Sequence, residues 1–201
     1  YYAKQRESSL KLWIMGPWEE DDPYAKEVFA LAKSLEVPDV IFTGRIQVTD
    51  YLGRMDATIL SSISEGQPLT ILEGFAAKCP AIATNVGNCE GLIYGEGNDT
   101  LGDAGIVTDT MSVSGLADAM VKLARNRDLA EHMGNVGYRR FLQKYQLKHM
   151  KDSYKNLYHD DLRLLRAEVD RLFSSKEGIS WQALEIRSNI PLKRKPYLLL
   201  H

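Results

Sequence analysis

The sequence has few cysteines, no long apolar run and almost no net charge, and each of these absences removes a class of protein. The chain has 201 residues and two cysteines, Cys79 and Cys89, which excludes a disulfide framework and favours a reducing compartment. No stretch approaches the roughly 18 apolar residues that span a bilayer, and the N-terminus lacks the layout of a signal peptide. A formal net charge of -2 gives no indication of nucleic acid as a partner. We therefore expect a cytoplasmic protein.

Several motifs that define common enzyme classes are also missing. No Gly-x-Gly-x-x-Gly or Walker-type loop follows an expected strand, which disfavours oxidoreductases and P-loop NTPases. No Gly-x-Ser-x-Gly elbow surrounds the serines near position 62, so hydrolase chemistry is unsupported. There is no Asp-x-Asp pair, and the histidines are scattered along the chain (His132, His149, His159 and His201). We therefore expect no cofactor and no required metal ion.

The sequence does contain a regular alternation of apolar strands and helices. The expected strands are residues 10–15, 40–42, 57–60, 81–84 and 105–107, and the expected helices are residues 24–35, 50–55, 68–77, 113–126, 129–145 and 149–173. Such alternation is typical of parallel βαβ units, and nearly continuous apolar strands are typical of sheets covered on both faces. The sequence therefore predicts an α/β fold with one open, doubly wound parallel sheet, followed by C-terminal helices.

The length permits one ordinary domain, and the pattern changes near the C-terminus. We expect a domain at residues 1–150, a long helix at 151–175 and a tail of unknown role at 176–201, which includes the basic residues 193–195. Apolar residues recur every three or four positions along the expected helix (Tyr158, Leu162, Leu165, Val169 and Leu172). This stripe either packs on its own domain or covers another one.

The most informative segment, residues 61–77, follows the third expected strand and runs into a helix. Ligands of parallel α/β sheets bind outside the carboxyl ends of the strands. Pro68 suits the first helical position, and the amides of Leu69 and Thr70 then point outward with the helix dipole behind them. Gly66 has no side chain and leaves room for a phosphate. The segment therefore predicts an anion site at this helix N-terminus.

Two glutamates flank the predicted anion site. Glu65 stands on the loop before the helix and Glu73 lies one turn inside it, so both face the same crevice. Carboxylates accept hydrogen bonds from hydroxyls, which suits a ligand with a phosphate between two hydroxyl-rich groups. The spacing alone is weak evidence, because solvated helix glutamates are common. The neighbouring residues decide between these interpretations.

The segment resembles the retaining glycosyltransferases of GT-B fold in the family called GT4, which carry a Glu-x7-Glu motif. The matching residues are Ser62, Glu65, Gly66, Pro68, Glu73, Ala76, Ala77, Pro80, Ala83, Thr84 and Gly87. Further runs at residues 16–17, 42–44, 86–89, 91–95 and 102–105 resemble the PelF-type transferases linked to the Pel exopolysaccharide. The resemblance covers roughly residues 10–158 and implies a Rossmann-like domain that binds a nucleotide sugar.

The resemblance implies a role for each matching donor-site residue. Glu73 would bind the ribose hydroxyls, while Glu65, the catalytic candidate, would hold the donor sugar and help to steer the leaving group. The distal phosphate would lie against the backbone of Gly66, Gln67, Pro68, Leu69 and Thr70, and the base against Gly44, Arg45 and Ile46. Gly16, Gly87 and Asn88 complete the donor-binding set. A solvated Arg45 and a plain turn at residues 87–88 are the alternatives.

The same resemblance implies that the active site is incomplete in this chain. In the family a basic pair on an earlier loop clamps the diphosphate, and residues 1–9 resemble the end of the helix that follows that loop. An N-terminal domain that binds the acceptor is expected as well. We expect most of the donor pocket here, and no sugar transfer by the chain alone.

The predicted function is transfer of a hexose from a nucleoside diphosphate sugar of UDP-glucose type to a growing polysaccharide, with retained anomeric configuration. The implied partners are the nucleotide sugar, the polysaccharide acceptor, the N-terminal domain and a membrane-bound complex for polysaccharide synthesis or export. The alternatives are a non-catalytic binding module and an isomerase on the same fold. The joint presence of Glu65 and Glu73 disfavours both.

Overall fold

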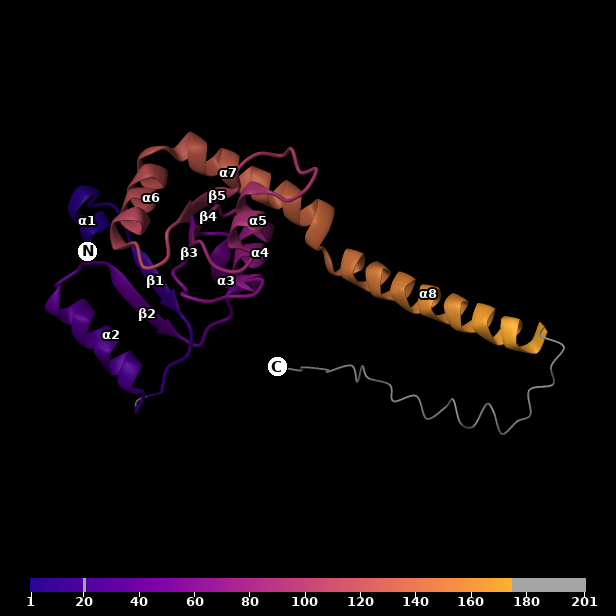
Figure 1. The fold of residues 1–201 in the computed structure, drawn as a ribbon. Helices are drawn as coiled ribbons and strands as arrows, with labels where there is room; N and C mark the ends of the chain where they lie inside the picture. The colour runs from indigo at the N-terminus through magenta and orange to yellow at the C-terminus, as the bar shows by residue number, and fades with distance from the viewer. Residues whose placement is uncertain (20, 175–201) are drawn as a thin grey trace. The chain divides into compact units, whose positions relative to one another are not determined.

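The computed structural model describes residues 1–19 and 21–174 (Figure 1). The predicted tail at 176–201, with its basic residues 193–195, lies outside the described residues, as do the side chains of Val169 and Leu172. The described residues divide into two units, the first Tyr1–Gln146 and the second beginning at Leu147. The sequence places the end of the first domain at residue 150, close to the end of the first unit.

Five strands form the sheets of the first unit, and every pair is parallel. They are β1 (Leu12–Met15), β2 (Val40–Gly44), β3 (Thr58–Leu60), β4 (Ala81–Thr84) and β5 (Gly105–Thr108). β1 pairs with β2 in one sheet, and the second sheet has the order β3-β4-β5. The parallel α/β class is thus confirmed, while the single sheet expected from the sequence is divided in two. Among the described residues, β1 and β3 each pair along one edge only.

The helices of the first unit alternate with these strands (Figure 1). They are α1 (Tyr2–Arg6), α2 (Pro23–Ser34), α3 (Thr49–Leu52), α4 (Leu69–Ala76), α5 (Cys89–Tyr94), α6 (Val113–Arg125) and α7 (Arg127–Arg140), and a π-helical turn follows at Phe141–Tyr145. The sequence analysis missed α5 and treated α7 and the π-helical turn as one helix. The second unit begins with α8 (Leu147–Ser174), close to the long helix expected there.

Helices cover both faces of the β3-β4-β5 sheet. Ala83 of β4 packs in a cluster with Phe75 of α4 and Leu92 of α5, whereas Ile82 packs in another cluster with Leu123 of α6. Successive strand residues point to opposite faces, so α4 and α5 lie on one face and α6 on the other. All four residues of β4 are buried, which explains their continuous apolar character. The doubly wound arrangement is therefore confirmed around β4.

A buried ion pair joins α7 to the segment after α5. The guanidinium of Arg140 donates to both carboxylate oxygens of Asp99, at 2.8 and 3.1 Å, and to the carbonyls of Leu92, Ile93 and Gly102. Neither charged side chain is more than 1% exposed. The hydrogen bonds from Arg140 hold the pKa of Asp99 well below its usual range. A charge pair at this depth tolerates burial because every donor of the guanidinium has an acceptor.

α8 is 28 residues long, yet charged side chains recur along its whole length. None of the helices within the described ranges combines the length and the apolar character needed to cross a membrane. Leu157, Tyr158 and Leu162 are exposed on this helix, as are Leu164 and Leu165.

Candidate functional site

The predicted donor site is built around the connection between β3 and α4. β3 ends at Leu60, a loop follows, and α4 begins at Leu69, so the connection lies at the carboxyl edge of a parallel sheet. Glu65 is half-buried on the loop, and Glu73 is exposed on α4. Glu65 therefore lies before the first residue of α4, and Glu73 is the fifth residue of this helix.

Pro68 has a different role from the one expected. It does not occupy the first helical position but caps α4 in an extended conformation, with φ -71° and ψ 116°. The structure buries Pro68, while Leu69 and Thr70 behind it are exposed. The fixed φ of proline suits both positions, which is why the sequence alone did not separate them. The first amides of α4 still have no partner within the helix.

The carboxylate of Glu65 is held from within its own loop. Ser62 donates a hydrogen bond from its hydroxyl to Oε1 of Glu65 at 2.7 Å. The carbonyl of Ser62 in turn accepts a 2.5 Å hydrogen bond from the hydroxyl of Thr84, which is 1% exposed at the end of β4. Sequence analysis did not single out Ser62 or Thr84 as site residues, although both belong to the family motif quoted above.

The turn between β4 and α5 lies directly against the same loop. The amide of Asn88 donates to the carbonyl of Gly66 at 2.8 Å. Gly87 has a φ of +52°, and a Cβ there would lie 2.4 Å from the carbonyl oxygens of Glu65 and Gly66. The side-chain oxygen of Asn88 lies beside Gly91, where it would stand 2.3 Å from an added Cβ. The structure therefore brings Gly87 and Asn88 to Glu65, about 22 residues away, through backbone contacts.

Gly16, Gly44, Arg45 and Ile46 form a second group at the carboxyl ends of β1 and β2. The amide of Gly16 donates to the carbonyl of Gly44 at 3.2 Å, so the two glycines lie side by side. Gly44 has a φ of +69°, which favours glycine, and the side chain of Arg45 is exposed. This group lies at the ends of β1 and β2, whereas Glu65 and Glu73 lie on the loop and the helix that follow β3 of the other sheet.

An aromatic cluster that sequence analysis did not identify supports this second group. The ring of Trp18 lies 5.2 Å from Phe29 of α2 and 6.4 Å from Phe42 of β2, measured between centroids. An atom of the Trp18 ring would be 3.6 Å from a Cβ added at Gly44. The only signal in the sequence was a tryptophan directly after Gly16-Pro17. Trp18 fixes the loop after β1 and packs over the turn that carries Arg45.

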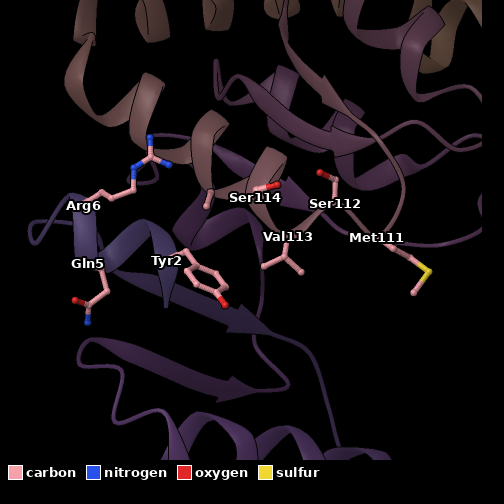
Figure 2. A pocket seen from close by; sticks show the side chains of 8 residues that line it. Tyr2, Gln5, Arg6, Met111, Ser112, Val113 and Ser114 are labelled. Carbon is pink, nitrogen blue, oxygen red and sulfur yellow. The ribbon is translucent and has the colours of Figure 1, made fainter.

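A cavity of about 590 Å³ lies elsewhere in the first unit, between α1 and the N-terminus of α6 (Figure 2). Tyr2, Gln5 and Arg6 line it on the α1 side, and residues 111–114 with Ala117 line it on the α6 side. None of the predicted donor-site residues lines this cavity. Arg6 also forms an ion pair with Asp118 of α6.

Both cysteines are buried and carry free thiols. Burial raises the pKa of Cys79 to about 11, and burial followed by the charge of Glu65 raises that of Cys89. Both thiols are therefore protonated at neutral pH and unreactive. Residues 1–19 and 21–174 contain no group of three or more histidine, cysteine or acidic side chains that could hold a metal ion.

Parallel strands with helices on both faces of the β3-β4-β5 sheet are the architecture of a Rossmann-like domain. The family described as "Glycosyl transferases group 1" matches residues 2–126, which is more than half of the chain. The chain belongs to this family of glycosyl transferases. The assignment of the chain to a glycosyltransferase family, made from the sequence, is thus confirmed. The PelF-type subgroup stays a prediction.

Known proteins resemble the chain over most of its length. N-acetyl-alpha-D-glucosaminyl L-malate synthase of Bacillus anthracis is 28% identical over 159 residues, which are 78% of this chain and 39% of that protein. Sucrose-phosphate synthase from Thermosynechococcus elongatus has a TM-score of 0.71 at 18% identity, over 81% of this chain and 41% of the other. Anabaena HepE in complex with UDP-glucose has a TM-score of 0.69 at 15% identity, over 79% and 43%. The chain thus spans about two fifths of each relative.

Proposed function

We propose that the chain is the donor-binding part of a retaining glycosyltransferase that moves a hexose from a nucleoside diphosphate sugar to a growing polysaccharide. The observation that carries this proposal is the position of Glu65 on the loop before α4 and of Glu73 on that helix, at the carboxyl edge of a parallel sheet. That placement offers a positive dipole end for phosphate between two acceptors for hydroxyl groups. Few ligands other than a nucleotide sugar have this order of groups.

Each end of the site suits one part of such a donor. The exposed carboxylate of Glu73 accepts hydrogen bonds from the ribose, and the amides of Leu69 and Thr70 bind the distal phosphate. Glu65 binds hydroxyls of the sugar and orients the bond that breaks as the diphosphate leaves. Gly16 and the turn of Gly44, Arg45 and Ile46 take the base. No metal is required, because the helix N-terminus and basic residues offset the charge of the leaving diphosphate.

The similar proteins support this assignment. One structure with the same fold is a complex with UDP-glucose, which agrees with a donor of that type. Another relative is named for an N-acetylglucosaminyl transfer to malate, so members of this group differ in acceptor. The PelF-like runs at residues 16–17, 42–44, 86–89, 91–95 and 102–105 favour a polysaccharide acceptor.

The remaining parts of the enzyme belong to the same proposal. The chain spans about two fifths of its relatives. The proposal assigns acceptor binding and the basic clamp for the diphosphate to residues outside this chain. The protein works in the cytoplasm and passes its product to a membrane-bound complex for polysaccharide synthesis or export. Without the acceptor domain, the chain binds the donor but transfers no sugar.

The test is sugar transfer by the natural full-length protein that contains this chain. We expect it to consume UDP-glucose, with or without a chelator, and to give a product whose anomeric configuration matches the donor by NMR. Glu65→Gln keeps the shape of the side chain but removes its charge, so kcat should fall far more than the affinity for UDP. Glu27→Gln, on the exposed side of α2, is the matched control. An inverted product, or equal turnover by the two variants, would contradict the proposal.

A further inference from the structure

The turn that joins β4 to α5 packs against the loop that carries Glu65. It is closed by its own hydrogen bond, from the amide of Cys89 to the carbonyl of Val86 at 3.1 Å. Residues 87 and 88 of the turn contact the Glu65 loop through backbone atoms. The amide of Asn88 donates to the carbonyl of Gly66, and Gly87 has no side chain. The turn and the loop are therefore in direct backbone contact, with no room for a side chain at Gly87.

Gly87 is the residue that permits this approach. A Cβ at this position would lie 2.4 Å from two carbonyl oxygens and 2.8 Å from the carbonyl carbon of Glu65, which are backbone atoms and have no free rotation. Any larger residue must therefore displace the peptide between Glu65 and Gly66. The φ of +52° adds a second, separate reason for glycine here.

The packing against Gly87 also sets where two backbone donors point. The peptide bonds are trans, so each N–H lies opposite the carbonyl of the preceding residue. The carbonyls of Glu65 and Gly66 face the turn at residues 86–89. The amides of Gly66 and Gln67 consequently point away from the turn, in roughly the same direction as each other. Adjacent amides with this geometry form a small concave site for an anion.

Ser62 fixes the Glu65 side chain in the same way that Gly87 fixes its backbone. Its hydroxyl holds one carboxylate oxygen at 2.7 Å and leaves the other carboxylate oxygen available. Ser62 itself is held by Thr84, which is buried at the end of the central strand β4. The carboxylate is therefore oriented before any ligand arrives.

We propose that Gly87 and Ser62 are positioning residues for the donor: Gly87 sets the direction of the Gly66 and Gln67 amides toward the diphosphate, and Ser62 sets the direction of the Glu65 carboxylate toward the sugar. This inference rests on the proposed function. In this proposal each residue acts through Glu65 or through the peptides beside it, so Gly87 is assigned a positioning role in place of the direct donor contact that the resemblance implies.

The first experiment compares Gly87→Ala with Gly97→Ala in the natural full-length protein. Gly97 has a similar φ of +61°, but no atom lies within 4 Å of an added Cβ, so its variant carries the backbone strain without the collision. We expect Gly87→Ala to weaken UDP binding by roughly tenfold and to lower kcat with UDP-glucose by roughly 100-fold, because small displacements of catalytic groups have effects of this size. Gly97→Ala should change neither. Equal effects of the two variants would overturn the role of Gly87.

The second experiment compares Ser62→Ala with Ser62→Thr, which keeps the hydroxyl, and with Ser61→Ala, an exposed neighbour. Loss of the hydroxyl frees the Glu65 carboxylate but leaves the amides in place. We expect Ser62→Ala to lower kcat by roughly 10- to 100-fold while the affinity for UDP stays within about twofold. Ser62→Thr should restore turnover. A loss of UDP affinity equal to the loss of kcat, or no loss at all, would overturn the role of Ser62.

A measurement without turnover separates this inference from the proposed function. We expect Gly87→Ala, but not Gly97→Ala, to shift the backbone amide resonances of Gly66 and Gln67 in the ligand-free protein. If those resonances move and the wild-type protein neither binds UDP nor consumes UDP-glucose, the proposed function fails while the backbone contact stands. If the wild-type enzyme is active and the resonances stay in place, the positioning role of Gly87 fails.

Discussion

At the scale of single residues, the two glutamates of the site differ in how they are held. Glu65 is half-buried and bonded to Ser62, whereas Glu73 is exposed on α4. A catalytic group must be held in one orientation, which suits a carboxylate with a fixed hydrogen-bond partner. A group that only binds the ligand can change its side-chain conformation as the ligand arrives, which suits an exposed carboxylate. The difference supports separate roles for the two residues in the proposed donor site.

Replacement of Glu73 should therefore act on binding. The carboxylate accepts hydrogen bonds from two neighbouring ribose hydroxyls in the proposed complex, and loss of such a charge-assisted pair costs about 2–4 kcal/mol. We expect Glu73→Ala to weaken UDP binding by that amount in calorimetry on the full-length protein. Glu27→Ala provides the comparison, because Glu27 is an exposed helix glutamate outside the site. Equal affinities for wild type and Glu73→Ala would show that ribose lies elsewhere.

At the scale of elements, the sequence predicts those strands and helices that have uninterrupted patterns. β4 is predicted with its observed ends because all four residues are apolar or small and buried on both faces. α5 was missed because it has only six residues and contains Gly91. This glycine leaves room for the side chains of Asn88 and Glu96, a tertiary contact that no local pattern indicates.

The candidate site, like the strands and helices, was predictable where it depends on a local sequence pattern and not where it depends on tertiary contacts. Glu65, Gly66 and Glu73 lie on one continuous segment, so the motif alone places them together. The contacts of Gly87 with Glu65 and of Thr84 with Ser62 join segments about 22 residues apart, and only the fold reveals them. The division into two sheets was not predictable either, because strand patterns do not report which edges pair.

The junction of α6 and α7 provides a test of one element boundary. Asn126 ends α6, and its side-chain oxygen accepts a hydrogen bond from the amide of Leu129 at the start of α7. We expect Asn126→Ala to lower the free energy of unfolding by about 1 kcal/mol in urea denaturation, since that is the usual contribution of an N-cap. Asn98→Ala, at an exposed loop position, should have less effect. If Asn126→Ala lowers the free energy of unfolding by no more than Asn98→Ala does, tertiary packing and not the N-cap determines where α7 begins.

At the scale of the whole molecule, the buried pair of Asp99 and Arg140 governs how stability depends on pH. The folded protein holds the pKa of Asp99 below its ordinary value, so the carboxylate stabilises the fold above that value and stops doing so as the pH falls through the folded pKa. We expect Asp99→Asn to lower the free energy of unfolding by about 3 kcal/mol at pH 7, because it leaves a buried arginine without its counter-charge.

The difference between wild type and Asp99→Asn should narrow as the pH is lowered below about 4, where the unfolded carboxyl begins to bind protons. Chemical denaturation at a series of pH values measures this difference directly. Asp103→Asn, at an exposed position nearby, serves as the control and should show no such convergence. A constant difference between wild type and Asp99→Asn at all pH values would contradict the ion pair as its source.

The division of the strands into two sheets has a consequence for local opening. α2 has no buried residue, and Leu12 and Ile14 of β1 are 36% and 37% exposed, whereas β4 is buried throughout. The segment from β1 to β2 should therefore unfold locally, as one cooperative unit, at a lower free energy than the β3-β4-β5 sheet. Amide hydrogen exchange should be faster at Ile14 and Phe42 than at Ile82. Gly16 and Gly44, which contact the base in the proposed complex, lie on this segment. Saturation with UDP should therefore slow amide exchange in the segment, because the bound base stabilises the closed form of its own binding surface.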